Sequence, residues 1–157
     1  MQYRMKTHQL TREQIRELLE QEQVGVLATV NADGTPYVTP MHFVYHDGAL
    51  YLHGLPAGQK VSNLKRCGSV CFTVYHMDGL LLDGEEKPCD TNTAYRSVIL
   101  NGTASFLEDP EAKRAALGRI IAKYTPQLTG RQLPDNMVRG TAVIRIEITS
   151  MTGKYWE

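Results

Sequence analysis

Cysteine is scarce in this sequence, and neither sign of charge is in excess. The three cysteines are an odd number and cannot all pair, so we expect reduced thiols rather than a disulfide framework. Cys67 and Cys71 are four residues apart, but a second spaced pair is missing, so the sequence predicts no metal site. Seventeen basic residues balance seventeen acidic ones, which argues against a nucleic-acid partner.

Long hydrophobic runs are also absent. No stretch approaches the roughly 18 apolar residues that cross a bilayer, and residues 1–9 are polar and basic without the apolar segment of a secretory signal. These features predict a cytoplasmic protein without a membrane partner. The hydrophobic fraction of 42% and the charged fraction of 22% are ordinary for a globular protein, and the length predicts a single domain over residues 1–157.

Hydrophobic periodicity predicts a mainly β protein. Thr11 and Gln14 form a capping-box pattern ahead of an apolar helical stripe. The expected strands cover residues 24–30, 37–45, 49–54, 69–75, 95–107 and 141–148, and further helices cover residues 59–66 and the segment after Asp109-Pro110. Residues 77–93 show little periodicity and predict a long loop. Because hairpin turns separate most strands, we expect an antiparallel, Greek-key-like β-barrel with flanking helices.

Two residues interrupt the expected strands. Pro40 lacks a backbone donor, so its strand must bulge, lie at an edge, or present its backbone to a ligand. Gly102 predicts a bulge or a close approach of two backbones.

Residues 52–64 suggest a phosphate site. A strand there ends in a glycine-containing turn that opens a helix, with Lys60 and Ser62 in the first turns. A phosphate at this point would gain free backbone N–H donors, the positive end of the helix and the charge of Lys60. The alternative is an ordinary strand-to-helix connection with Lys60 in solvent.

The histidines do not form a chelating pair, but one is a candidate for catalysis. His42 and His46 are four residues apart on one strand, about 13 Å at about 3.3 Å per residue, which is too far to share a metal ion. His53 precedes the glycine turn and is the candidate catalytic proton donor, because histidine titrates near neutral pH. The alternative is a histidine that only packs.

The order of several segments resembles a known family. The segments are Val-Gly-Val-Leu-Ala-Thr from Val24, Asn-x-Asp-Gly-x-Pro-Tyr-Val-x-Pro-Met-x-Phe-Val-Tyr from Asn31, Leu-Tyr-x-His-Gly-x-Pro-x-Gly-x-Lys from Leu50 and Tyr-Arg-Ser-Val-Ile-x-x-Gly from Tyr95. In this order they resemble the pyridoxamine 5'-phosphate oxidase-like split barrels, and most closely the nitroimidazole-resistance (Nim) flavoproteins. The resemblance covers about residues 10–154.

The resemblance implies an FMN-binding split barrel that works as a homodimer, with FMN at the subunit interface. The cofactor-binding residues it implies in one subunit are Val38, Thr39, Pro40, Met41, His42, His53, Gly54, Gln59, Lys60 and Ser62. Those it implies from the other subunit are Tyr95, Arg96, Ser97, Val98 and Trp156. The implied activity is a flavin-dependent oxidoreductase that reduces a small electrophile, such as a nitroaromatic or nitroimidazole compound, with electrons from NAD(P)H. The chain lacks the strongly basic substrate-phosphate set of the true oxidases, so we do not expect it to oxidise pyridoxamine phosphate.

Two other functions stay open. A barrel of this kind could hold flavin or haem as a sensor or store, with His42 or His53 as an iron ligand. A small barrel could also bind single-stranded nucleic acid, although the zero net charge disfavours it.

Overall fold

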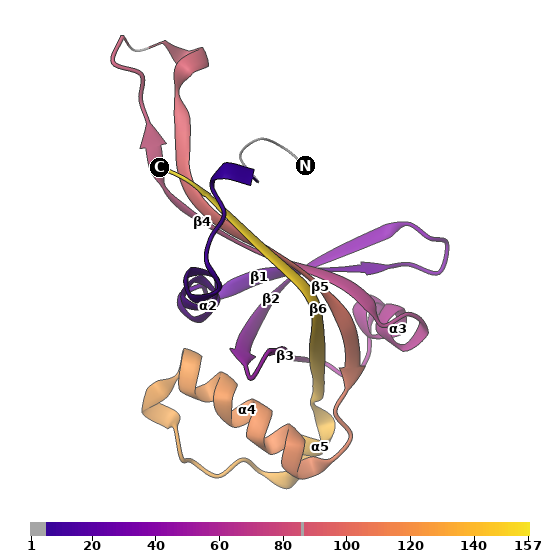
Figure 1. Cartoon of the computed structure of the whole chain (residues 1–157). Coiled ribbons are helices and arrows are strands. Elements are labelled where there is room, and N and C mark those ends of the chain that lie inside the picture. Colours follow the sequence, from indigo (N-terminus) through magenta and orange to yellow (C-terminus); the bar gives the residue numbers. More distant parts are fainter. Residues whose placement is uncertain (1–5, 86) are drawn as a thin grey trace.

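Antiparallel strands close into a barrel in the computed structural model, which describes residues 6–85 and 87–157 (Figure 1). The strands are β1 (Val24–Val30), β2 (Pro36–His46), β3 (Ala49–Gly54), β4 (Ser69–Leu81), β5 (Asn92–Phe106) and β6 (Ala142–Trp156). Their order around the barrel is β1-β2-β3-β6-β5-β4. Because β4 returns to lie beside β1, the first four strands form a Greek key. The predicted mainly β, Greek-key-like barrel with flanking helices is confirmed.

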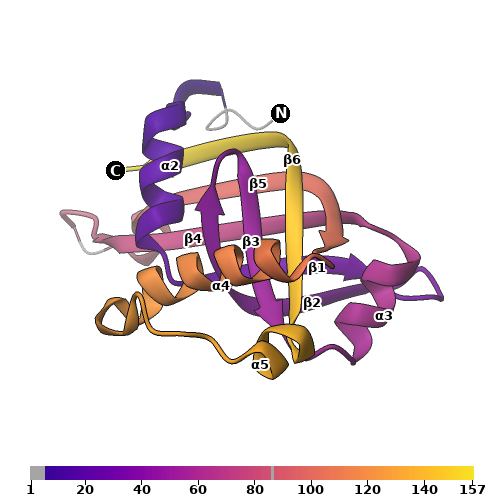
Figure 2. The same ribbon diagram turned by 90° about the horizontal axis from the view of Figure 1, so that it is seen from below.

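Helices flank the barrel on several sides. They are α2 (Arg12–Gln21), α3 (Gln59–Arg66), α4 (Pro110–Tyr124) and α5 (Asp135–Gly140), with short 3-10 turns η1 (Pro88–Asp90) and η2 (Pro126–Leu128). The predicted capping box is confirmed, because Thr11 Oγ1 accepts from the Gln14 N–H at 3.2 Å and Gln14 Oε1 accepts from the Thr11 N–H at 2.8 Å. Figure 2 shows α4 lying across β2 and β3, with α2 and α3 at opposite ends of the barrel.

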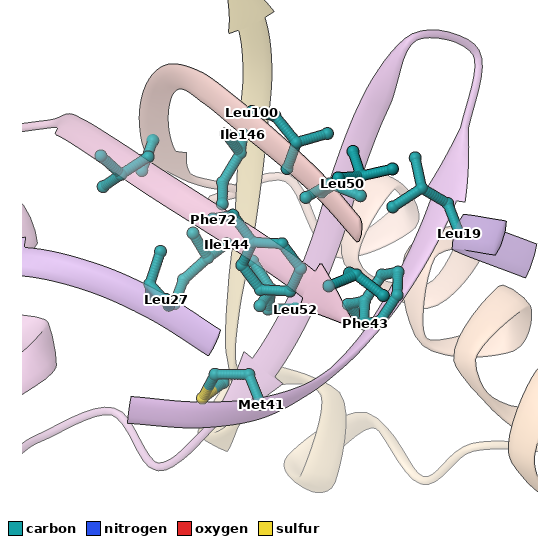
Figure 3. Close-up of a cluster of buried hydrophobic side chains, with 14 of the residues drawn as sticks. Leu19, Leu27, Met41, Phe43, Leu50, Leu52, Phe72, Leu100, Ile144 and Ile146 are labelled. Carbon is teal, nitrogen blue, oxygen red and sulfur yellow. The ribbon is translucent and has the colours of Figure 1, made fainter. Parts of the chain in front are cut away.

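The barrel interior is filled by alternate side chains of the strands. On β4 and β5 these are Phe72, Val74, Val98 and Leu100, each at most 1% exposed. Leu18 and Leu19 of α2 join the same cluster and are fully buried. Figure 3 shows the labelled core side chains, with Met41 at one end of the cluster. The core therefore reaches the part of β2 that carries the candidate site.

The structure differs from the sequence prediction between residues 77 and 93. The prediction of a loop over residues 77–93 is wrong at both ends, since β4 and β5 continue as paired strands to Leu81 and from Asn92, and the connection between them is shorter than predicted. Beyond the barrel they form a protruding two-stranded arm (Figure 1). Asp78 is an extra residue in a β-bulge between Met77 and Gly79, and a bulge interrupts the alternation by which a strand is recognised.

The last strand is longer than predicted. β6 continues to Trp156 rather than ending at Ile148, and its pairing with β5 shifts register between Asn101 and Gly102. The bulge or close approach predicted for Gly102 is confirmed, because a Cβ atom built there would lie 2.4 Å from Glu147 O.

Pro40 lies on an unpaired edge, which is one of the alternatives that the sequence left open. Residues 36–42 of β2 pair with β1, where Pro40 is opposite Val26. Pairing of β2 with β3 begins only at Phe43, so within the described part of the chain this segment has a strand neighbour on one side alone. The missing N–H of proline is tolerated at such an edge.

The hydroxyl of Tyr124 forms hydrogen bonds with the backbone just before β1 and in β2. It accepts from the Phe43 N–H at 2.9 Å and lies 2.6 Å from Gln23 O and 2.9 Å from Phe43 O. We expect Tyr124→Phe to lower the free energy of unfolding by about 1–2 kcal/mol, because a partly buried N–H loses its acceptor. Urea denaturation would measure this. The control Tyr37→Phe should cost less than about 0.5 kcal/mol, and equal losses in the two variants would contradict the role of Tyr124.

Candidate functional site

The open edge of β2, the end of β3 and the start of α3 surround a shallow pocket of about 310 Å³. Its lining residues are Val24, Pro40, Met41, His42, His53 and Lys60, and it is termed the Lys60 pocket below. All but Val24 are residues for which the sequence predicted cofactor binding. The structure therefore brings three separate predicted segments together at one place.

The start of α3 offers free backbone donors beside this pocket. Its N-cap residue is Gly58, whose φ of 118° suits glycine, and no side chain caps the helix. Gln59 donates from Nε2 to Asn31 Oδ1 at 3.1 Å and to Asn63 Oδ1 at 2.9 Å. The buried Asn63 in turn donates to Thr29 Oγ1 at 3.1 Å. This network fixes the first turn of α3 against the β1–β2 hairpin while leaving its N–H groups uncapped.

Lys60 is a half-buried cation without an acidic partner. Its Nζ lies 3.0 Å from Met41 Sδ, and a thioether sulfur is only a weak acceptor. No carboxylate of the described residues forms an ion pair with it. Burial lowers the pKa of Lys60, as expected when an ammonium leaves water uncompensated. Gly54 makes room for the ammonium, since a Cβ built there would lie 3.3 Å from Nζ.

His53 lines the same pocket and carries one nitrogen without a partner among the described residues. Its Nδ1 is buried and has no hydrogen-bond partner in the part of the chain that the structure describes. Burial lowers the pKa of His53, and the nearby charges of His42 and Lys60 lower it further. The imidazole is therefore neutral near pH 7. A buried polar atom without a partner is rare, and a ligand is one way to satisfy it.

Tyr124 packs against His42, one of the residues that line the pocket. Its ring stacks on His42 with centroids 4.6 Å apart and an interplanar angle of 27°. The sequence gives no sign of this contact, because nothing local connects Tyr124 with a histidine 82 positions earlier. Val24 was identified only as a strand residue.

Other predicted residues near α3 and β2 lie beside the pocket without lining it. Val38 and Thr39 belong to the free edge, and the side chain of Val38 is exposed. Gln59 holds α3 in place through its amide. Ser62 is exposed on the first turns of α3. These positions leave their predicted cofactor contacts as predictions.

The remaining predicted residues lie in a second region, on β5 and β6. Tyr95, Arg96 and Trp156 line one hollow, and Ser97 lines another with Lys154. The side chain of Val98 is fully buried in the core. Val143 of β6 pairs with His53, and Trp156 of β6 pairs with Tyr95. At about 3.3 Å per residue, Val143 and Trp156 are about 40 Å apart along the strand. Within one chain this region does not meet the Lys60 pocket.

The described residues contain no group of three or more histidine, cysteine, aspartate or glutamate side chains arranged to hold a metal ion. None of the helices in residues 6–85 and 87–157 is long and apolar enough to cross a membrane.

The lowered pKa of His53 makes a prediction for stability against pH. Because the folded pKa lies below the ordinary 6.5, the unfolded chain binds more protons as pH falls below about 6.5, and the contribution of neutral His53 to stability is lost. We expect His53→Gln to flatten the fall in unfolding free energy between about pH 7 and pH 5. Urea denaturation across that range would measure it. His46→Gln should keep the wild-type slope, and an unchanged slope in His53→Gln would contradict the assignment.

Comparison with known proteins gives the family of the chain. A family model described as pyridoxamine 5'-phosphate oxidase matches residues 11–155. The chain belongs to this family. The resemblance stated from the sequence is thereby confirmed, and the fold is the split barrel of the pyridoxamine 5'-phosphate oxidase family. A search of curated proteins gave no match.

Several solved structures are similar to this family member. A candidate 5-nitroimidazole antibiotic resistance protein from Bacteroides thetaiotaomicron VPI-5482 is 31% identical, with a TM-score of 0.78, covering 94% of this chain and 86% of that chain. An FAD and heme binding protein from Mycobacterium smegmatis is 23% identical, with a TM-score of 0.86, covering 96% and 74%. An F420 reductase is 24% identical, with a TM-score of 0.59, covering 88% and 94%. The last two likenesses show the fold alone.

Proposed function

We propose that this chain is a cytoplasmic, FMN-dependent reductase that works as a homodimer with FMN at the subunit interface. The observation that carries the proposal is the Lys60 pocket. There Lys60, which forms no ion pair with a carboxylate of the described residues, and His53, whose buried Nδ1 has no hydrogen-bond partner among them, line one opening beside the uncapped start of α3. Each is a binding group without a partner, and FMN has a matching group for each.

The residues of the pocket fit FMN in chemical kind. The uncapped N–H groups of α3 and Lys60 would hold the phosphate. The free edge of residues 36–42 would offer backbone groups to the polar rim of the ring system. The side chains of Met41 and Val24 supply apolar surface. FAD carries the same flavin ring with a longer tail, and the short connection before α3 suits a terminal phosphate better.

The openness of the pocket supports the proposed homodimer. A volume of about 310 Å³ lies at the low end for ligand sites, and Pro40 and His42 on its wall are exposed. A flavin ring held there would keep one side in water unless a second chain covered it. The predicted residues Tyr95, Ser97 and Trp156 cannot reach the pocket of their own chain, so a second copy is the source we propose.

The reaction we propose is reduction of a small electrophile such as a nitroaromatic or nitroimidazole compound, with electrons from NADH or NADPH. The similarity to the 5-nitroimidazole resistance candidate supports this substrate class. Bound FMN would supply reversible two-electron chemistry. Conversion of a nitro to a nitroso group takes two electrons and two protons and releases water. In this proposal His53, which lines the pocket and whose pKa is lowered by burial, would relay protons to the site.

Reconstitution tests this proposal directly. The purified protein, mixed with FMN and passed over a desalting column, should keep a yellow flavin spectrum. NADH or NADPH should bleach it under anaerobic conditions, and a nitroimidazole should restore it with loss of the nitro absorbance. A protein that retains none of the three flavins FMN, FAD and riboflavin would overturn the proposal. Bound flavin that neither nicotinamide reduces, or a haem Soret band, would favour the carrier or sensor alternative.

A further inference from the structure

The outward face of the β4–β5 sheet carries an apolar stripe. Residues directly opposite each other in an antiparallel pair share a face, and alternate residues along a strand do too. Phe72 and Val74 of β4 point into the core, so the residues that alternate with them along β4 point outward, as do the residues opposite those on β5. The apolar residues that face outward, termed the outer stripe, are Tyr75, Met77, Leu80, Tyr95 and Ile99, and the polar residues Thr73, Thr93 and Ser97 face the same way beside them. Four residues of the outer stripe are between 42% and 59% exposed, and Tyr95 stacks on Tyr75 with ring centroids 5.8 Å apart.

The bulge at Asp78 extends this stripe from the barrel wall into the arm. Met77 is opposite Tyr95, and Leu80 is opposite Thr93. Tyr95 and Thr93 are two residues apart on β5 and so lie on one face. Their partners Met77 and Leu80 therefore also share that face, although they are three residues apart on β4. Without the extra residue Leu80 would lie on the other face. The sequence therefore keeps an exposed apolar surface continuous along the arm.

Among the residues that the structure describes, no third strand supports the arm. β6 pairs with β5 only as far as Tyr95, and beyond that point β4 and β5 pair with each other alone. A two-stranded hairpin is marginally stable in water by itself. An exposed apolar face of this kind marks a contact surface.

Charge indicates what lies against the arm. Among the described residues, the tip of the arm carries three acidic residues, Asp83, Glu85 and Asp90, and one basic residue, Lys87. α3 carries Lys60, Lys65 and Arg66 and no acidic residue. α3 ends just before β4 begins, whereas the arm lies where β4 ends, so acid and base stand at opposite ends of one strand (Figure 1).

We propose that two copies pair through their outer stripes with their β4 strands running in opposite directions, so that the arm of each copy lies against α3 and the Lys60 pocket of the other. The opposite arrangement, with the two β4 strands running the same way, would place two acidic tips together and leave both α3 helices without a counter-charge. This inference rests on the proposed homodimer and adds which surfaces meet and in which direction.

Cross-linking between copies tests the direction of pairing. One chain carries Cys67→Ser and Cys71→Ser and keeps the exposed Cys89 of the arm. A second chain carries the same changes with Cys89→Ser and Lys65→Cys on α3. After the two are mixed and treated with a short bismaleimide, we expect a covalent dimer whose linked peptides contain positions 65 and 89. The control replaces Lys65→Cys by Met137→Cys on α5, where the side chain is 61% exposed, and should give no link.

Charge reversal in the otherwise natural chain gives a second measurement. Lys65→Glu or Asp90→Lys should each weaken the dimer about 5- to 10-fold, since each change acts twice in a symmetric pair. The double variant should recover most of the affinity. Sedimentation equilibrium at low salt would measure the dissociation constants.

The outcomes separate this inference from the proposed function. A link between positions 65 and 89 together with charge rescue supports it. Three results would overturn the arrangement while leaving the dimer. They are a Cys89–Cys89 link when the first chain is treated alone, a link to position 137, and a dissociation constant that neither charge reversal changes. A monomer at all concentrations overturns the arrangement and the homodimer together. FMN retention is measured apart from both.

Discussion

Lys60→Met should lower the affinity for FMN about 10- to 150-fold. A hydrogen bond to a charged group contributes about 1.5–3 kcal/mol, and each 1.4 kcal/mol is tenfold in affinity. Within its own chain Lys60 forms no ion pair with a carboxylate of the described residues, so its ammonium is available to the phosphate. Methionine keeps an unbranched apolar stem but is one atom shorter than lysine, so the substitution removes the ammonium, with its contact to Met41 Sδ, at a small change in volume.

Riboflavin makes this result specific to the phosphate. It has the same ring system and ribityl chain as FMN but no phosphate, so its affinity should change less than about threefold in Lys60→Met. Quenching of flavin fluorescence on titration would give both dissociation constants. Lys60→Arg should retain most of the FMN affinity, and Lys6→Met, at an exposed lysine, should retain all of it. Equal losses for FMN and riboflavin would place the phosphate elsewhere.

The parts of the fold that could be predicted from the sequence are those with local signals. The capping box at Thr11, the turn of residues 31–35 and the glycine-containing turn before α3 each determine their structure within a few residues. The arm could not be predicted in this way. Asp78 and Gly79 look like loop residues in the sequence, but in the structure they form a bulge that long-range pairing with β5 holds in place.

The candidate site shows the same division. Met41, His42, His53 and Lys60 meet because β2 and β3 are joined by a tight turn and α3 follows at once, so a local reading could place them together. Tyr124 reaches His42 from α4 through packing that no pattern in the sequence reports. The predicted residues on β5 and β6 lie far from the pocket in one chain. Their role depends on contacts between chains, for which the sequence has no local signal.

Gly102→Ala should lower the free energy of unfolding by about 3 kcal/mol and the melting temperature by about 6–12 °C. A Cβ atom built at this position would lie 2.4 Å from Glu147 O and 2.7 Å from Ile146 Cγ2. The nearer atom is backbone of β6 at the register shift, so it cannot move aside without breaking the ladder. The strand that must shift is the one that also pairs with His53.

A glycine in open surroundings provides the control. Gly118 lies within α4, and a Cβ built there meets nothing within 4 Å, so Gly118→Ala should raise stability by about 0.5–1 kcal/mol through helix propensity. The two variants add the same methyl group and should move the urea midpoint in opposite directions. If Gly102→Ala unfolds at the wild-type midpoint, β5 and β6 do not approach each other at the bulge as described. A fall in midpoint without loss of FMN retention at low temperature would show that the Lys60 pocket tolerates strain at the bulge between β5 and β6.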